Sequence, residues 1–318
     1  MKQRLSAILA AWSLCLAGCA SAGADAVTKA ADALDRNDPN TTIELTTKVI
    51  EMGGLSPTIE ASAYVNRGGG YVLKMQYDLA IIDFNRAIAI DPDRTSAYSN
   101  RGAAYLFQEK YDLAVEDFSR AIMLEPSVNY FLNRGVAYRR SGKYDLAIAD
   151  YDEAIRRVPN DIAAHVARAF AYQMQGRMEE AIASYTTLIN LQPNSASHYS
   201  SRCSALTRSG KPLEAVRDCD RALAIRPGDP GILKNRAYAY LKSAQYALAI
   251  ADYDTVIRTI PRSADALYGR GIAKMNTGES SGSADDIDAA KRLDPRIVET
   301  FDAISGRLSI DVSVRDVF

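Results

Sequence analysis

Apolar and polar positions along the chain follow a pattern that returns every 33 or 34 residues. Within each period, small and aromatic residues recur at helical spacing in two stretches, which predicts two amphipathic helices. In four of the seven periods a glycine separates the two stretches, and glycine commonly ends a helix in the left-handed region. A proline closes each period and stops the second helix: Pro92, Pro126, Pro159, Pro193, Pro227, Pro261 and Pro295. Since one helix pair cannot bury its apolar faces alone, the pairs should stack into a solenoid with a concave inner surface.

One period shows the pattern in full. Its small, aromatic and proline positions read Tyr98-x-x-Arg101-Gly102-x-x-Tyr105, then Ala114-x-x-x-Phe118, Ala121 and Pro126. This order closely resembles the tetratricopeptide repeat. The resemblance implies an all-α fold, a right-handed superhelical solenoid of antiparallel helix pairs, with seven units over residues 61–297.

Both ends of the array depart from the consensus pattern. Residues 25–57 read as a degenerate helix pair that forms an additional unit at the N-terminal end. At the other end, Ile297, Val298, Phe301 and Ile304 form an apolar stripe, which predicts a capping helix over 297–305. Residues 306–318 alternate between apolar and polar side chains, which predicts an extended or disordered tail.

The N-terminus carries an export signal. Lys2 and Arg4 precede an apolar run that is too short for a membrane span. The segment Leu16-Ala17-Gly18-Cys19 resembles the bacterial lipobox, which implies cleavage between Gly18 and Cys19 and lipid attachment at Cys19. We therefore interpret residues 1–18 as a lipoprotein signal peptide and 19–24 as a lipidated linker. Cleavage by the soluble-export peptidase after residues 20–22, Ala-Ser-Ala, is the alternative.

The lipid anchor would hold the protein on a bilayer without spanning it. By resemblance to lipoproteins of two-membrane bacteria, Ala20 after the cysteine favours the periplasmic face of the outer membrane. The alternative cleavage would instead give a soluble periplasmic or secreted protein.

Composition excludes several classes of function. The 318 residues carry 38 basic and 39 acidic side chains, a net charge of −1, so no electrostatic footprint for nucleic acid is present. Two histidines and four cysteines occur without metal-ligand spacing, and the chain has no phosphate loop or nucleophile motif. We expect no cofactor, no metal and no catalytic site.

An arginine precedes the small residue of every first helix, and an acidic residue follows it 16 positions later in six of seven units. A row of unpaired arginines would suit an anionic ligand, whereas a partly buried arginine needs a carboxylate partner. We favour structural ion pairs within the helix pairs. The predicted pairs are Arg67 with Asp83, Arg101 with Asp117, Arg134 with Asp150, Arg202 with Asp218, Arg236 with Asp252, and Arg270 with Asp286.

Protein or peptide binding is the usual task of the repeat family that this chain resembles. The lysines and asparagines of the carboxylate clamp found in one subset of the family are absent here apart from Lys234. The inner face should instead present small and apolar side chains to an apolar or helical segment: Val65, Ala103, Leu106, Phe107, Val136, Phe170 and Tyr238. Equally, these side chains could pack between neighbouring first helices and leave no free groove.

Two cysteines remain after signal removal. Cys203 replaces the small residue of a first helix and Cys219 replaces the aromatic residue of the following helix, so both should face one interface. A disulfide and a pair of buried thiols are both compatible with this placement, and we favour the thiols.

These expectations together predict a membrane-tethered periplasmic scaffold or adaptor that binds a protein partner without catalysis. A soluble exported protein that binds a small ligand, such as a glycan or lipid, is the alternative. The role of a scaffold rests on the resemblance of the fold alone.

Overall fold

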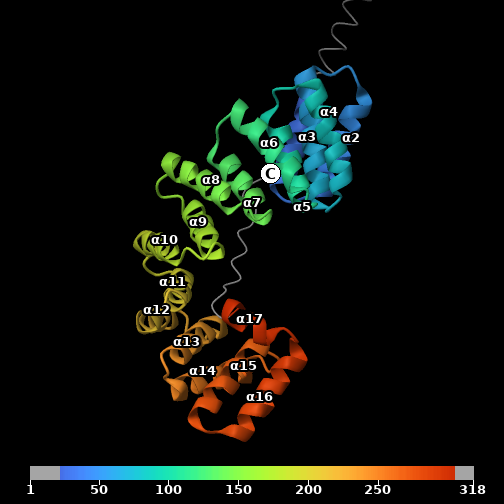
Figure 1. The fold of residues 1–318 in the computed structure, drawn as a ribbon. Helices are drawn as coiled ribbons and strands as arrows, with labels where there is room; N and C mark the ends of the chain where they lie inside the picture. The colour runs from blue at the N-terminus through green and yellow to red at the C-terminus, as the bar shows by residue number, and fades with distance from the viewer. Residues whose placement is uncertain (1–21, 305–318) are drawn as a thin grey trace, which may run out of the picture. The chain divides into compact units, whose positions relative to one another are not determined.

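The computed structural model describes residues 22–304, apart from the side chains of residues 280, 281 and 302–304, and within this range it contains helices and turns but no strand (Figure 1). The helix that includes residues 22–35 is followed by sixteen more. Their bounds are α2 Pro39–Met52, α3 Pro57–Leu73, α4 Tyr77–Ile90, α5 Thr95–Phe107, α6 Tyr111–Leu124, α7 Val128–Arg140, α8 Tyr144–Arg157, α9 Ile162–Met174, α10 Met178–Leu191, α11 Ala196–Arg208, α12 Pro212–Ile225, α13 Pro230–Lys242, α14 Tyr246–Thr259, α15 Ala264–Thr277, α16 Ser280–Leu293 and α17 Ile297–Ile304.

The chain divides into two compact units between Arg157 and Val158. In the first unit, α3 pairs with α4, α5 with α6 and α7 with α8, and each pair packs on the next. In the second unit, four more pairs run from α9 to α16 and stack in the same way. The sequence prediction of an all-α solenoid of antiparallel helix pairs is therefore confirmed within each unit.

The three helix pairs from α3 to α8 are each closed by contact between a glycine and an aromatic ring. Phe84, Phe118 and Tyr151 are fully buried against the glycines of the preceding helices. A Cβ added to Gly135 would lie 2.5 Å from Cε1 of Tyr151, closer than real Cβ atoms come. The aromatic ring therefore requires glycine opposite it, and the tight fit explains why small and aromatic residues recur together.

The turn inside each pair contains a residue in the left-handed region. Gly142 and Gly278 have φ of 77° and 89°, as the sequence pattern predicts, whereas Met75, Glu109 and Ala244 adopt φ of 58° to 61° without being glycine. Residues with a Cβ are uncommon in this region. The turn geometry is thus conserved among the pairs although the residue is not.

The N-terminal helix pair consists of the helical residues 22–35 and α2. Thr42 Oγ1 donates a hydrogen bond to the Ala30 carbonyl oxygen at 3.2 Å, and Asn66 Nδ2 donates to the Val27 carbonyl oxygen at 3.1 Å. Residues 22–24, which we expected in a linker, belong to the helix.

The signal peptide, Gly18, Cys19 and the tail 306–318 lie outside the described residues. Within residues 22–304 no helix combines the length and the apolar character that crossing a bilayer requires.

Candidate functional site

The predicted arginine and aspartate pairs lie side by side in all six helix pairs. In each, Nε and Nη2 of the guanidinium donate to the two carboxylate oxygens at 2.5 to 2.9 Å. The aspartate side chains are at most 10% exposed, and the arginine side chains are 18 to 22% exposed. A two-pronged contact of this kind satisfies both buried charges. These arginines are thus committed to internal partners and do not form an open cationic ladder.

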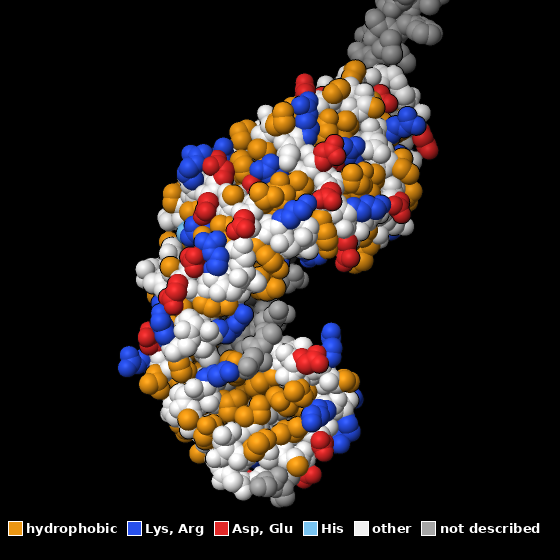
Figure 2. Space-filling view, viewed as in Figure 1, with side chains coloured by type: hydrophobic (Ala, Val, Ile, Leu, Met, Phe, Trp, Pro, Cys, Tyr) orange, Lys and Arg blue, Asp and Glu red, His pale blue; other side chains and the backbone are white. Residues whose placement is uncertain are grey.

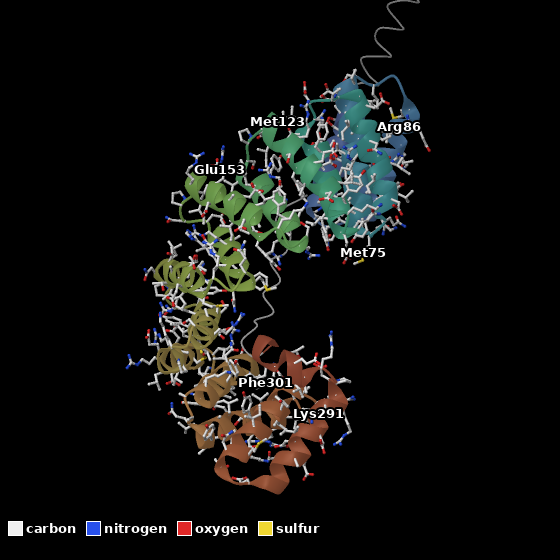
Figure 3. All side chains as sticks on the ribbon, viewed as in Figure 1. Met75, Arg86, Met123, Glu153, Lys291 and Phe301 are labelled. Carbon is white, nitrogen blue, oxygen red and sulfur yellow. A yellow bond between two sulfur atoms is a disulfide. The ribbon has the colours of Figure 1, made fainter. Side chains whose placement is uncertain are left out.

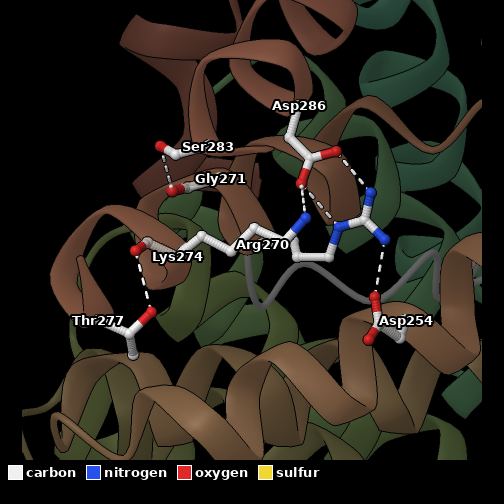
Figure 4. Close-up of polar contacts among 7 residues, drawn as sticks. All are labelled: Asp254, Arg270, Gly271, Lys274, Thr277, Ser283 and Asp286. Atoms are coloured by element: carbon white, nitrogen blue, oxygen red, sulfur yellow. Dashed lines mark hydrogen bonds and ion pairs between the residues drawn. The ribbon is translucent and has the colours of Figure 1, made fainter. Parts of the chain in front are cut away.

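The remaining nitrogen of each arginine reaches back to the preceding helix pair, which the sequence analysis missed. Arg270 Nη1 donates to Asp254 at 2.7 Å while its other nitrogens contact Asp286 (Figure 4). Arg101 Nη1 donates to Asn85 at 2.5 Å in the same way. One side chain therefore ties together two helices of its own pair and the second helix of the pair before.

The electrostatic environment of the aspartates differs between the pairs. Burial raises the pKa of Asp117 above its ordinary value, even though Arg101 hydrogen-bonds the carboxylate. At Asp286, burial acts in the same direction, but hydrogen bonds from Arg270 and Lys274 outweigh it and lower the pKa. Lys274 Nζ, 3.0 Å from Asp286 Oδ2, is a second cation at this carboxylate.

The groove predicted from the sequence is largely filled. Five of its seven residues are buried among neighbouring helices, with exposed fractions from 0 to 8%: Val65, Ala103, Leu106, Val136 and Tyr238. Phe170 is half-buried, and Phe107 is 44% exposed with its ring stacked on Tyr77 at 5.4 Å. Of the two arrangements that the sequence leaves open, these five positions are packed and do not line an open groove.

Polar side chains connect consecutive first helices in the second unit. Gln173 Nε2 on α9 donates to Ser204 Oγ on α11 at 3.2 Å, and Asn235 Nδ2 on α13 donates to Ser200 Oγ at 3.0 Å. Further along, Lys234 Nζ on α13 lies 2.7 Å from Asp265 Oδ2 on α15. Each link spans one repeat, so it fixes the spacing of the first helices. Lys234, the one residue that fits the clamp pattern, is thereby held by an internal carboxylate.

A cleft of about 360 Å³ opens beside the first helices α13 and α15. Leu241, Tyr268 and Ile272 give it an apolar wall, and Lys242 and Asn276 add polar groups. In Figure 2 hydrophobic side chains gather on this part of the second unit. Its volume falls within the range of ligand sites in proteins, though near the lower end. Of the positions predicted to line a groove, only Tyr238 lies next to this cleft, in the same apolar cluster as Leu241 and Ile272.

Cys203 and Cys219 are joined by a disulfide between α11 and α12. Their Cα atoms are 5.7 Å apart, which suits a disulfide, and both residues are fully buried. Of the two alternatives that the sequence leaves open, the structure has the bridge, not the free thiols that we favoured. The bond lies where other helix pairs place an aromatic ring against a small residue.

The two histidines have structural partners and do not form a catalytic pair. His165 Nε2 lies 2.8 Å from the Pro159 carbonyl oxygen, and His198 Nε2 lies 2.9 Å from Gln192 Oε1. The Tyr98 hydroxyl makes the equivalent contact, donating to the Pro92 carbonyl oxygen six positions earlier. Burial lowers the pKa of His198. Among residues 22–304, no three His, Cys, Asp or Glu side chains gather so as to hold a metal ion.

Solved structures that resemble the chain in fold include two repeat proteins. A tetratricopeptide repeat protein from Parabacteroides merdae ATCC 43184 is 16% identical, with a TM-score of 0.57 over 85% of this chain and 99% of the other. The C-terminal part of a TPR repeat-containing protein from Cytophaga hutchinsonii is 20% identical, with a TM-score of 0.64 over 76% of this chain and 98% of the other. At these identities the likeness concerns the fold alone. The comparison with curated protein sequences found no match.

Family models match the repeats directly. Those described as tetratricopeptide repeats match residues 61–94, 95–128, 163–195 and 234–296, and one described as a TPR repeat matches 135–176. Together they cover more than half of the chain and fall on the helix pairs described above. The protein therefore belongs to the tetratricopeptide repeat family.

Proposed function

We propose that this protein is a lipid-tethered, non-catalytic scaffold on the periplasmic face of a bacterial outer membrane. It binds a protein partner through the first-helix face of its second unit. Repeats of this family are typical of protein-interaction scaffolds, which supports the general role. The tether rests on the lipobox-like segment ending at Cys19.

The observation that carries the partner site is the cleft on α13 and α15. It combines an apolar wall, formed by Leu241, Tyr268 and Ile272, with polar groups at Lys242 and Asn276. Protein-binding surfaces are rich in such aromatic side chains with a polar rim. The six paired arginines cannot serve as an open binding site, because internal carboxylates engage them.

The disulfide supports an exported location. Structural disulfides persist in oxidising compartments such as the periplasm and are rare where thiols are kept reduced. Cys203 and Cys219 are joined and fully buried in the folded body. An oxidising compartment is also where the predicted signal would deliver the chain.

Site-specific photo-cross-linking in intact cells tests the proposal. A photo-reactive residue at Ile272, which lines the cleft, should give a discrete protein adduct in the membrane fraction. The matched control is Leu213 on the second helix α12, which is 64% exposed and should give no such adduct. Cys19→Ala should move the protein out of the membrane fraction or leave uncleaved precursor.

Two results would contradict the proposal. Equal labelling from both positions would show that the cleft does not select a partner. A fully soluble wild-type protein that carries a glycan or lipid in native mass spectrometry would favour the alternative, a soluble binding protein for a small ligand.

A further inference from the structure

The last described helix, α17, lies against the first-helix face of the second unit. At the junctions between repeats, as from α12 to α13 and from α14 to α15, the next helix packs on the second helix before it. By contrast, α17 packs more extensively on the first helix α15 than on the second helix α16. It therefore does not simply continue the stack.

One side of α17 supplies this contact. Ile297 and Phe301, four residues apart and hence on one helix face, are 1% and 4% exposed. They join an apolar cluster with Tyr238, Leu267 and other residues of the last repeats. Val298 on the same helix is 53% exposed. A single apolar stripe, anchored by one aromatic residue, thus holds α17 in place.

Phe301 contacts two tyrosines of neighbouring first helices. Figure 3 labels Phe301 in the second unit. Its ring centroid lies 5.7 Å from that of Tyr238 on α13 and 4.9 Å from that of Tyr268 on α15, with interplanar angles of 86° and 67°. Edge-to-face contacts of this kind are favourable for aromatic rings. We call Tyr238 and Tyr268 the aromatic clamp, and Phe301 is the residue that they hold.

The apolar surface around the aromatic clamp is larger than α17 covers. The cleft of about 360 Å³ continues from Phe301 along Leu241, Tyr246 and Ile272, and it stays open beside α17. Glu299 of α17 and Lys242 of α13 line the same cleft. An eight-residue helix is also too short to be stable by itself in water, so α17 depends on this surface for its helical state.

We propose that α17 is an exchangeable resident ligand of this surface, and that the partner presents an amphipathic helix that displaces it. The partner helix carries an aromatic residue for the aromatic clamp and an acidic residue two positions before it, as Glu299 precedes Phe301. A longer helix of this kind fills both the clamp and the open cleft, which gives it an advantage over α17. This inference rests on the proposed binding of a protein partner and adds a built-in competitor to it.

A peptide-binding experiment on the full-length mature protein tests the exchange. The probe is a fluorescein-labelled peptide with the sequence of residues 294–306, followed by fluorescence anisotropy. Phe301→Ala removes the resident anchor, so this variant should bind the probe at least tenfold more tightly than the wild type. Thr300→Ala is the matched control and should bind as weakly as the wild type, because Thr300 does not line the cleft and its hydroxyl donates to the Arg296 carbonyl oxygen of its own helix.

Two further variants show that the aromatic clamp is the binding site. Adding Tyr238→Ala to Phe301→Ala should abolish probe binding while the circular dichroism spectrum is retained. A probe with alanine in place of its phenylalanine should not bind Phe301→Ala. Ile297→Asp places a charge in the buried stripe of α17 and so releases the helix by a second route. This variant should also bind the probe more tightly than the wild type.

The proposal is overturned if Phe301→Ala and Ile297→Asp keep their helical content but bind the probe no better than the wild type. That result would show that α17 is a permanent cap that does not exchange with a partner helix. Cross-linking of a partner at Ile272 in that case would still support the scaffold. Probe binding without any partner adduct in cells would instead contradict the scaffold and leave the exchange in place.

Discussion

Removal of one member of a buried ion pair should cost far more than removal of both. In the pair formed by Arg101 and Asp117, the guanidinium donates at 2.8 and 2.7 Å to a carboxylate whose side chain is only 5% exposed. Arg101→Leu leaves that carboxylate buried without its cation, which should lower the free energy of unfolding by about 3–5 kcal/mol. Replacing both residues by leucine should change it by about 1 kcal/mol or less.

A double-mutant cycle isolates the coupling between the two side chains. The hydrogen bond from Arg101 to Asn85 is lost in both Arg101 variants, so it cancels from the coupling energy. The exposed pair of Arg120 and Asp93, with exposed fractions of 40% and 80%, is the matched control. Its coupling should stay below about 1 kcal/mol, as for surface ion pairs in general.

Urea unfolding followed by circular dichroism, at pH 7 and at pH 4, provides the assay. Burial raises the pKa of Asp117, and without Arg101 nothing in this ion pair opposes that effect. A carboxyl group whose pKa is raised in the folded state stabilises the fold at pH values below its pKa in the unfolded chain. This contribution to the free energy of unfolding is lost as the pH rises through the raised pKa. The cost of Arg101→Leu should therefore shrink on acidification. Additive single effects, or a cost no larger than that of Arg120→Leu, would refute the reasoning.

Three further predictions concern the helix pairs. Reduction of the bridge between Cys203 and Cys219 should lower the thermal midpoint, since closure of this loop contributes about 3 kcal/mol on the chain-entropy model; an unchanged midpoint would contradict it. Gly135→Ala should destabilise by about 1–3 kcal/mol in urea unfolding, because the new Cβ meets the ring of Tyr151. Because the pKa of Asp286 is lowered in the folded state, its carboxylate stabilises the fold at pH values above the ordinary carboxyl pKa. This contribution to the free energy of unfolding is lost as the pH falls through the lowered pKa. Asp286→Asn should therefore flatten the dependence of the free energy of unfolding on pH in this range, as measured by urea unfolding.

The helix pairs and their ion pairs could be predicted because both depend on positions within one repeat. A separation of 16 residues places Arg101 and Asp117 on facing helices, and the period repeats that placement. The link from Arg101 to Asn85 has the same separation in the other direction and was therefore visible in the sequence. We missed it because the acceptor changes from asparagine to serine, threonine or aspartate between repeats.

Contacts that depend on the distance between repeats could not be predicted in the same way. The sequence places Ala103 and Val136 on the inner face of their helices, but it does not determine how closely the next first helix approaches. Likewise, the apolar stripe of α17 predicts a packed helix without indicating that Phe301 contacts Tyr238 and Tyr268. The disulfide depends on the final separation of the two Cα atoms, which the pattern of small residues leaves open.

The central claim, a tethered periplasmic scaffold, is tested most directly by mass spectrometry of the mature N-terminus. The account predicts an N-terminal peptide that begins at Cys19 and carries a diacylglyceryl group on sulfur and an acyl chain on the amino group. An unmodified N-terminus that begins after residue 22, or a chain that retains Met1, would contradict it.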